Sequence, residues 1–86
     1  MYKIVFTKKA AKDAPLLKAA GLKQKAMYIL NILETNPFQN PPSYEKLKGD
    51  LTGAYSRRLN IQHRIVYQVL EEEKIVKILR MWTHYE

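Results

Sequence analysis

The chain has 86 residues, of which 47% are hydrophobic and 27% are charged, and it contains no cysteine. This length predicts a single domain over residues 1–86, and the lack of cysteine excludes disulfides and thiolate metal sites. The apolar runs are too short for a transmembrane helix and the first residues lack a signal-peptide pattern, so we expect a cytoplasmic protein that does not enter a membrane. The net charge of +7 favours a polyanionic partner such as nucleic acid.

The first half of the chain is predicted to contain one strand and two helices. Residues 2–6 are β-branched and aromatic, which is typical of a strand, and Thr7 can cap a helix that starts at Lys8. Pro15 lies inside that helical stretch, so we expect either a kink or a second start with Asp13 as its cap. A second helix is predicted by apolar residues that recur on one face: Leu22, Ala26, Ile29, Leu30 and Leu33.

The second half is predicted to form a linker and three strands. Residues 37–44 contain three prolines, and Phe38 is expected to fix this linker to the core. Strands are predicted over residues 55–60, 64–70 and 74–83, and their short links imply antiparallel hairpins. The order β-α-α-β-β-β predicts an α+β fold, with two N-terminal helices packed on one face of a small, mainly antiparallel sheet. The place of the first strand within that sheet stays undecided.

Pairing of the last two strands should separate an apolar sheet face from a polar one. We expect Val69 to pair with Ile75 across the turn of three glutamates. The face toward the helices would then hold Ile65, Tyr67, Val69, Leu79 and Met81. The opposite face would hold Arg64, Arg80, Trp82 and His84. A slip of one residue in this register would exchange the faces.

The second half also carries the side chains that would suit cleavage of RNA by attack of a 2′-hydroxyl on the neighbouring phosphorus. This reaction needs a base for the hydroxyl proton, an acid for the departing 5′-oxygen, and cations for the charged phosphorane between them. General acid and base groups each contribute about 10²–10⁴-fold to the rate, and no metal or other cofactor is required. The candidates are Glu45, Arg57, Arg58, Arg64, His84 and Tyr85.

The run YEKLKGDLTGAYSRR, residues 44–58, resembles the central motif of the Txe/YoeB toxins of the RelE superfamily. The similarity continues through IQHRIVY, residues 61–67, and through the pair His84-Tyr85. It implies one toxin domain over residues 1–86 with a fold like that of the small microbial ribonucleases. It also implies the toxin of a type II toxin–antitoxin pair, which cuts mRNA, typically in the ribosomal A site, and so inhibits translation.

The resemblance implies a role for each residue of the motif. Glu45 would be the general base, His84 the general acid and Arg64 the group that stabilises the phosphorane. Tyr85 would position or stack the nucleotide.

Further substrate contacts are expected from basic residues near this set. Arg57 and Arg58 alternate along a strand, so only one of them can point to each face of the sheet, and we favour Arg58 as the substrate contact. Lys48 is equally suited to phosphate binding and to a solvated surface. His63 is expected in a hairpin turn, with contact to ribosomal RNA as an alternative, and Trp82 is expected to pack on the sheet, with base stacking as an alternative.

The implied partners are mRNA, the ribosome and a cognate antitoxin of the Phd/YefM type, acidic and partly disordered. Operator DNA would be contacted only through the antitoxin, and a homodimer is a further assembly that we consider. Lysines of the two predicted helices could bind ribosomal RNA through its phosphates: Lys8, Lys9, Lys12, Lys18, Lys23 and Lys25. Two alternatives stay open, a non-catalytic RNA- or ribosome-binding module and a relative with another target such as gyrase. The joint presence of a full acid/base set disfavours the second.

Overall fold

The computed structural model of the protein describes residues 1–82. The elements are β1 (Lys3–Phe6), α1 (Lys8–Ala19), α2 (Lys23–Thr35), β2 (Glu45–Lys46), the 3₁₀ helix η1 (Gly49–Leu51), β3 (Ala54–Arg58), β4 (Arg64–Leu70) and β5 (Ile75–Arg80). The predicted order of helices and longer strands is confirmed. The structure adds β2 and η1, which are too short to produce a periodic pattern in the sequence. Within this part of the chain, no helix is long and apolar enough to cross a membrane.

Helix α1 begins where its capping residue predicts. Thr7 accepts a hydrogen bond on Oγ1 from the backbone N–H of Ala10 at 3.1 Å, which satisfies one of the donors left open at a helix start. Pro15 lies inside the helix without ending it, so the predicted alternative of a second start at Asp13 is wrong. Pro15 and Ala11 are both exposed, and water can therefore replace the hydrogen bond that the proline removes.

Helix α2 follows after Gly21, whose φ of 75° is accessible mainly to glycine. The helix ends at Thr35 with Asn36 as its C-cap, because Pro37 cannot continue it. Its buried side chains are Ala26, Ile29, Ile32 and Leu33. Three of these belong to the predicted apolar face, and the helix packs through that face on the sheet.

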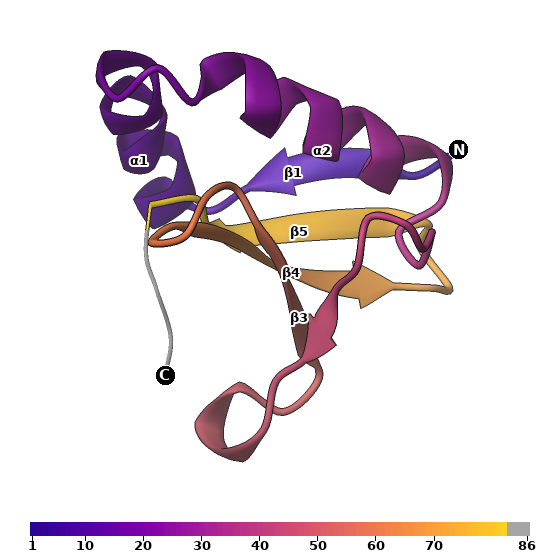
Figure 1. Ribbon diagram of the computed structural model, residues 1–86. Coiled ribbons are helices and arrows are strands. Elements are labelled where there is room, and N and C mark those ends of the chain that lie inside the picture. The colour runs from indigo at the N-terminus through magenta and orange to yellow at the C-terminus, as the bar shows by residue number, and fades with distance from the viewer. Residues whose placement is uncertain (83–86) are drawn as a thin grey trace.

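The five strands form one sheet in the order β1-β5-β4-β3-β2. β1 lies parallel to β5 at one edge, and the other neighbours are antiparallel. This settles the place of the first strand, which the sequence left open. Figure 1 shows both helices on one side of the sheet, while the loop between β2 and β3 projects away from them. One face of β2, β3 and β4 is therefore left without a helix.

The register of the last hairpin differs by one residue from the predicted one. Val69 pairs with Val76, and Leu70 pairs with Ile75. The expected pairing of Val69 with Ile75 is therefore wrong, and the buried residues of β5 are Val76 and Ile78 rather than Ile75 and Leu79. The turn accounts for the difference, because Lys74 adopts a φ of 56° and takes part in the turn rather than in the strand.

An irregularity in the same hairpin restores the predicted faces further along. Tyr67 pairs with Ile78 and Val66 pairs with Arg80, which leaves Leu79 as an extra residue on β5. An extra residue reverses the alternation of side chains beyond it. Met81 is consequently buried in the core, as predicted, with 4% of its surface exposed.

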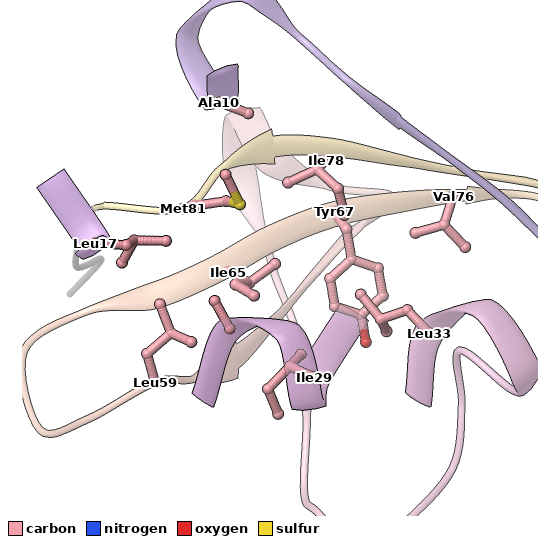
Figure 2. Packing of buried hydrophobic residues seen from close by; sticks show 11 residues of the cluster. Ala10, Leu17, Ile29, Leu33, Leu59, Ile65, Tyr67, Val76, Ile78 and Met81 are labelled. Atoms are coloured by element: carbon pink, nitrogen blue, oxygen red, sulfur yellow. The ribbon is translucent and has the colours of Figure 1, made fainter. Parts of the chain in front are cut away.

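The core lies between the sheet and the two helices. Figure 2 shows Ile65 and Tyr67 of β4 beside Ile29 and Leu33 of α2. The rest of the buried cluster consists of Ala10 and Leu17 of α1, Ala26 of α2, Val76 and Ile78 of β5, Leu59 and Met81. The predicted packing of the helices on one sheet face is confirmed.

Candidate active site

Two of the predicted catalytic residues are in direct contact on the helix-free part of the sheet. Arg64 donates a hydrogen bond from Nη1 to Oε1 of Glu45 at 3.0 Å and another to Oγ of Ser56 at 3.1 Å. Glu45 on β2 is opposite Ser56 on β3, and Arg64 is the first residue of β4. Three neighbouring strands thus bring together residues that are up to 19 positions apart in the chain.

This pair is open to solvent on its carboxylate side. The Glu45 side chain is 60% exposed and the Arg64 side chain is 14% exposed. An ion pair with so exposed a partner contributes at most about 1 kcal/mol to stability. Among the residues that the structure describes, Nε and Nη2 of Arg64 make no hydrogen bond. These two groups can donate to an anion that approaches Glu45.

Arg58 adds a second positive charge beside Arg64. The two residues are directly opposite each other on β3 and β4, so their side chains leave the same face of the sheet. Like charges in this arrangement repel, and an anion bound between them would offset the repulsion. Arg58 is exposed and Lys48, just before η1, is exposed as well. Both predicted substrate contacts are therefore accessible.

Arg57 occupies a different environment from the one predicted. It is 1% exposed and donates hydrogen bonds to the carbonyl oxygens of Pro37, Gln39 and Pro42 at 2.9, 2.8 and 2.7 Å. Its Nε donates to the hydroxyl of Tyr67 at 3.0 Å. Arg57 therefore has no surface with which to meet an RNA, and its predicted role as a substrate contact is wrong.

The Arg57 contacts fix the proline-rich segment that leads into β2. The guanidinium also lies 4.9 Å from the ring centre of Tyr44, the residue before Glu45. Phe38 packs edge-on against Tyr55 at 5.4 Å, so its predicted role as an anchor is confirmed. Burial raises the pKa of Tyr67, so its hydroxyl stays protonated and donates to the carbonyl of Pro37 at 3.2 Å. The base candidate thus follows a rigidly held segment.

The remaining catalytic and stacking candidates, His84 and Tyr85, lie outside the described residues. The segment just before them is held by Asp13, which the sequence offered only as the cap of an alternative second start of α1. Asp13 of α1 is 4% exposed and accepts hydrogen bonds from Nε of Arg80 and from the backbone N–H groups of Met81 and Trp82. The signal for this role was that Asp13 is the only acidic residue before Glu34.

Arg80 is on the same face of the sheet as Arg64, as predicted, because it lies opposite Val66, but its guanidinium binds Asp13. Its Nε lies 2.9 Å from Oδ2 of Asp13, and Nη2 lies 3.3 Å from Oδ1. Burial by itself raises the pKa of Asp13, but the hydrogen bonds from Arg80, Met81 and Trp82 and the Arg80 charge outweigh it and hold the pKa below 3.8. Asp13 is therefore an ionised carboxylate at neutral pH.

Trp82 packs against the core, as predicted, and its ring is stacked on His63. The ring centres are 3.7 Å apart and the planes differ by 16°. His63 lies in the loop between β3 and β4, as expected, and directly precedes Arg64. Its Nδ1 is buried and has no hydrogen-bond partner among the described residues.

The other side of the molecule offers a hollow of a different kind. An open groove of about 710 Å³ lies between α1 and α2, lined by apolar side chains with Lys18 and Lys23 at its border. Neither Glu45 nor Arg64 contributes to it, so it holds none of the acid/base chemistry considered above. Within residues 1–82, no group of three His, Cys, Asp or Glu side chains is placed to hold a metal ion.

Comparison with known proteins agrees with this architecture. The family described as YoeB-like toxin of bacterial type II toxin–antitoxin systems matches residues 6–85. Toxin YoeB of Synechocystis sp. is 34% identical over 74 residues, which cover 86% of this chain and 77% of that protein. The chain belongs to this family, and it is the toxin of a type II toxin–antitoxin system.

Solved structures show the same RelE-superfamily fold. A YoeB/ParE toxin from Agrobacterium tumefaciens is similar with a TM-score of 0.86 and 28% identity, over 96% of this chain and 99% of that one. YoeB of Staphylococcus aureus, in a heterotetrameric YoeB–YefM toxin–antitoxin complex, has a TM-score of 0.81 and 32% identity over 99% of both chains. The same S. aureus toxin is also known as a dimer.

Proposed function

We propose that the protein is an endoribonuclease that cleaves mRNA in the cytoplasm, in the A site of the ribosome, and thereby inhibits translation. Glu45 takes the proton of the 2′-hydroxyl, and the 2′-oxygen attacks the adjacent phosphorus. His84 gives a proton to the departing 5′-oxygen. The products are a 2′,3′-cyclic phosphate, or the 3′-phosphate formed from it, and a 5′-hydroxyl.

The observation that carries this proposal is the contact of Glu45 with Arg64 at 3.0 Å on an open sheet face. A base and a phosphate-binding cation side by side are what attack at phosphorus requires. Arg64 keeps Nε and Nη2 available to the phosphorane, and Arg58 supplies a second charge opposite it. Tyr85 and Lys48 are retained as contacts to the nucleotide and its phosphates.

The proposed partner in the cell is an acidic antitoxin of the YefM type. The S. aureus relative is bound to YefM, and this chain has a net charge of +7 to be neutralised. Dimerisation of this chain is proposed from the dimer of the same relative. Any contact with operator DNA would be made by the antitoxin.

A cleavage assay tests the proposal. The purified protein is added to ribosomes translating a defined mRNA, and cut sites are mapped by primer extension. Glu45→Gln, Arg64→Ala and His84→Gln should each lower the single-turnover rate by about 10²–10⁴-fold. The control is Glu72→Gln, which changes an exposed acid in the β4–β5 turn and should cleave at the wild-type rate.

A non-catalytic RNA- or ribosome-binding module is the second candidate. It is favoured by the exposed lysines of α1 and α2: Lys8, Lys9, Lys12, Lys18, Lys23 and Lys25. The same assay separates the two functions. Wild-type cleavage in all three site variants would reject the assigned residues, and ribosome binding without any cleavage by the wild-type protein would favour the binding module.

A further inference from the structure

Trp82 is held by contacts with two other parts of the chain, Asp13 of α1 and His63 of the β3–β4 loop. Its backbone N–H donates to Oδ2 of Asp13 at 3.2 Å, and the N–H of Met81 donates to the same oxygen at 2.9 Å. Arg80 binds both oxygens of that carboxylate. The ring of Trp82 is stacked on His63. α1, the β3–β4 loop and the end of β5 therefore meet at this residue.

A buried carboxylate is an unusual way to secure a strand end. An apolar side chain would fill the same space on α1 without the cost of removing a charge from water. Asp13 instead receives donors from three consecutive residues, Arg80 to Trp82. This arrangement fixes the direction in which the backbone leaves β5, which apolar packing alone would not do.

The backbone that carries the stacked ring of His63 is held by hydrogen bonds within its loop. Oδ1 of Asn60 accepts hydrogen bonds from the N–H groups of Gln62 and His63 at 2.8 and 2.7 Å. The N–H of Leu59 donates to the carbonyl of His63 at 2.8 Å. Because Arg64 follows His63 directly, the stack ties Trp82 to the strand start that carries the phosphate-binding arginine.

We propose that Asp13 and His63 are positioning residues. They fix Trp82, the residue from which the last residues of the chain continue, and so place His84 for proton donation. This inference rests on the proposed ribonuclease function. His84 follows Trp82 by two residues, which span at most about 7 Å of extended chain. A shift of Trp82 would therefore shift His84, and a misplacement of about 1 Å can lower a rate by about 10²-fold.

Substrates with different leaving groups test whether Asp13 acts through the acid. A 5′-thiolate departs without protonation, because thiols have a pKa near 8.5, whereas the natural 5′-oxygen needs a proton. The mRNA carries a single bridging 5′-sulfur at the mapped cleavage position, and cleavage on programmed ribosomes is compared with that of the all-oxygen mRNA. Asp13→Asn should lower kcat about 10–100-fold on the all-oxygen mRNA and leave KM within about 2-fold of the wild-type value. On the mRNA with the 5′-sulfur, the decrease in kcat should be much smaller.

His84→Gln is the reference for an acid defect, and Glu72→Gln is the control for an exposed acid. Asp13→Asn should share the substrate pattern of His84→Gln. An equal loss on both substrates would show a general structural defect and overturn the proposal. Unchanged cleavage by Asp13→Asn would overturn it as well.

Variants of His63 keep the proposal testable if Asp13→Asn folds poorly. His63→Phe preserves an aromatic surface for Trp82, whereas His63→Ala removes it. We expect His63→Phe to stay within about 3-fold of the wild-type kcat and His63→Ala to lose about 10-fold with the oxygen substrate. Equal losses in both variants would mean that the imidazole itself matters, which contradicts a stacking role.

Hydrogen exchange followed by NMR gives a readout that does not depend on cleavage. The amide hydrogen of Trp82 should exchange at least about 10-fold faster in Asp13→Asn than in the wild type, with little change in the core of β4. Unchanged exchange at Trp82 would overturn the anchor. If the wild-type protein shows this protection but cleaves no RNA, the proposed ribonuclease function and the role of His84 are rejected. The attachment of Trp82 to Asp13 would still be supported.

Discussion

Arg57 and Arg64 lie on neighbouring strands and illustrate two uses of the same side chain. Arg57 is 1% exposed, and each of its three guanidinium nitrogens donates to an oxygen of the protein. Arg64 uses one nitrogen for Glu45 and Ser56 and faces an open surface. The hydrogen bonds of Arg57 are satisfied within the protein, whereas Arg64 keeps N–H groups that can bind a ligand.

The contrast predicts which arginine is essential for folding and which for activity. A buried acceptor that loses its hydrogen-bond donor lowers the free energy of unfolding by about 1–3 kcal/mol. Loss of an exposed ion pair changes the free energy of unfolding little. A cation that faces the charge developing in a transition state lowers the activation barrier by several kcal/mol. The four predictions below test this division, from the largest effect to the smallest.

Arg57→Leu should produce the largest loss of stability. The variant leaves the carbonyl oxygens of Gln39 and Pro42 and the hydroxyl oxygen of Tyr67 without their donor, and the carbonyl of Pro37 keeps only the Tyr67 hydroxyl. We expect the free energy of unfolding to fall by more than about 3 kcal/mol, measured by urea denaturation. The matched control is the adjacent exposed residue, Arg58→Leu, which should change it by less than about 0.5 kcal/mol. A loss below about 1 kcal/mol in Arg57→Leu would contradict the structural role.

Arg64→Lys should separate activity from stability. The ammonium keeps the charge but cannot present several donors in one plane to a phosphate. We expect cleavage to slow about 10²-fold, or roughly 2.7 kcal/mol in barrier. Unfolding by urea should change by less than about 1 kcal/mol. A variant with full activity would show that Arg64 serves only as a point charge.

Arg80 lies between these two extremes, with its side chain 33% exposed and its Asp13 partner 5% exposed. The folded-state pKa of Asp13 is below its ordinary value of 3.8. The ionised Asp13 carboxylate therefore stabilises the fold fully at a pH above 3.8. This stabilisation is lost as the pH falls from 3.8 through the lower folded-state pKa. The wild type should exceed Asp13→Asn by about 1–3 kcal/mol at neutral pH, and this difference should shrink below about pH 4. A difference that is constant down to about pH 2 would contradict the assignment.

Ser56→Ala should have the smallest effect. It removes one hydrogen bond to Arg64, which Glu45 continues to bind. We expect a loss of about 0.5–1.5 kcal/mol in unfolding free energy and less than about a 10-fold loss in cleavage. A loss as large as that of Arg64→Lys would indicate that the hydroxyl touches the substrate.

The order of helices and longer strands was predictable because it depends on local patterns. The cap at Thr7, the apolar face of α2 and the stop at Pro37 each involve residues within a few positions of one another. The short strand β2 was not predictable, since two residues carry no periodicity. β2 exists because Glu45 and Lys46 find partners on β3.

Within the candidate site, the motif marked the residues but not their surroundings. Glu45 and Arg64 were each predicted as catalytic residues, and they are in contact. Arg57 and Arg58 were indistinguishable by type, and only the path of residues 37–42 around Arg57 shows which is buried. Asp13 and Trp82 are 69 positions apart, so no local pattern could connect them.

The sequence by itself determined the family, the sequence of helices and strands, and the residue types able to perform acid/base chemistry on a phosphodiester. These properties are carried by short motifs and local periodicity, which need no knowledge of distant contacts. The tertiary structure alone decided the register of β4 with β5, the burial of Arg57 and the attachment of the strand end to Asp13. Each of these depends on which donors and acceptors meet when remote segments pack, because buried polar groups must find partners wherever the fold supplies them.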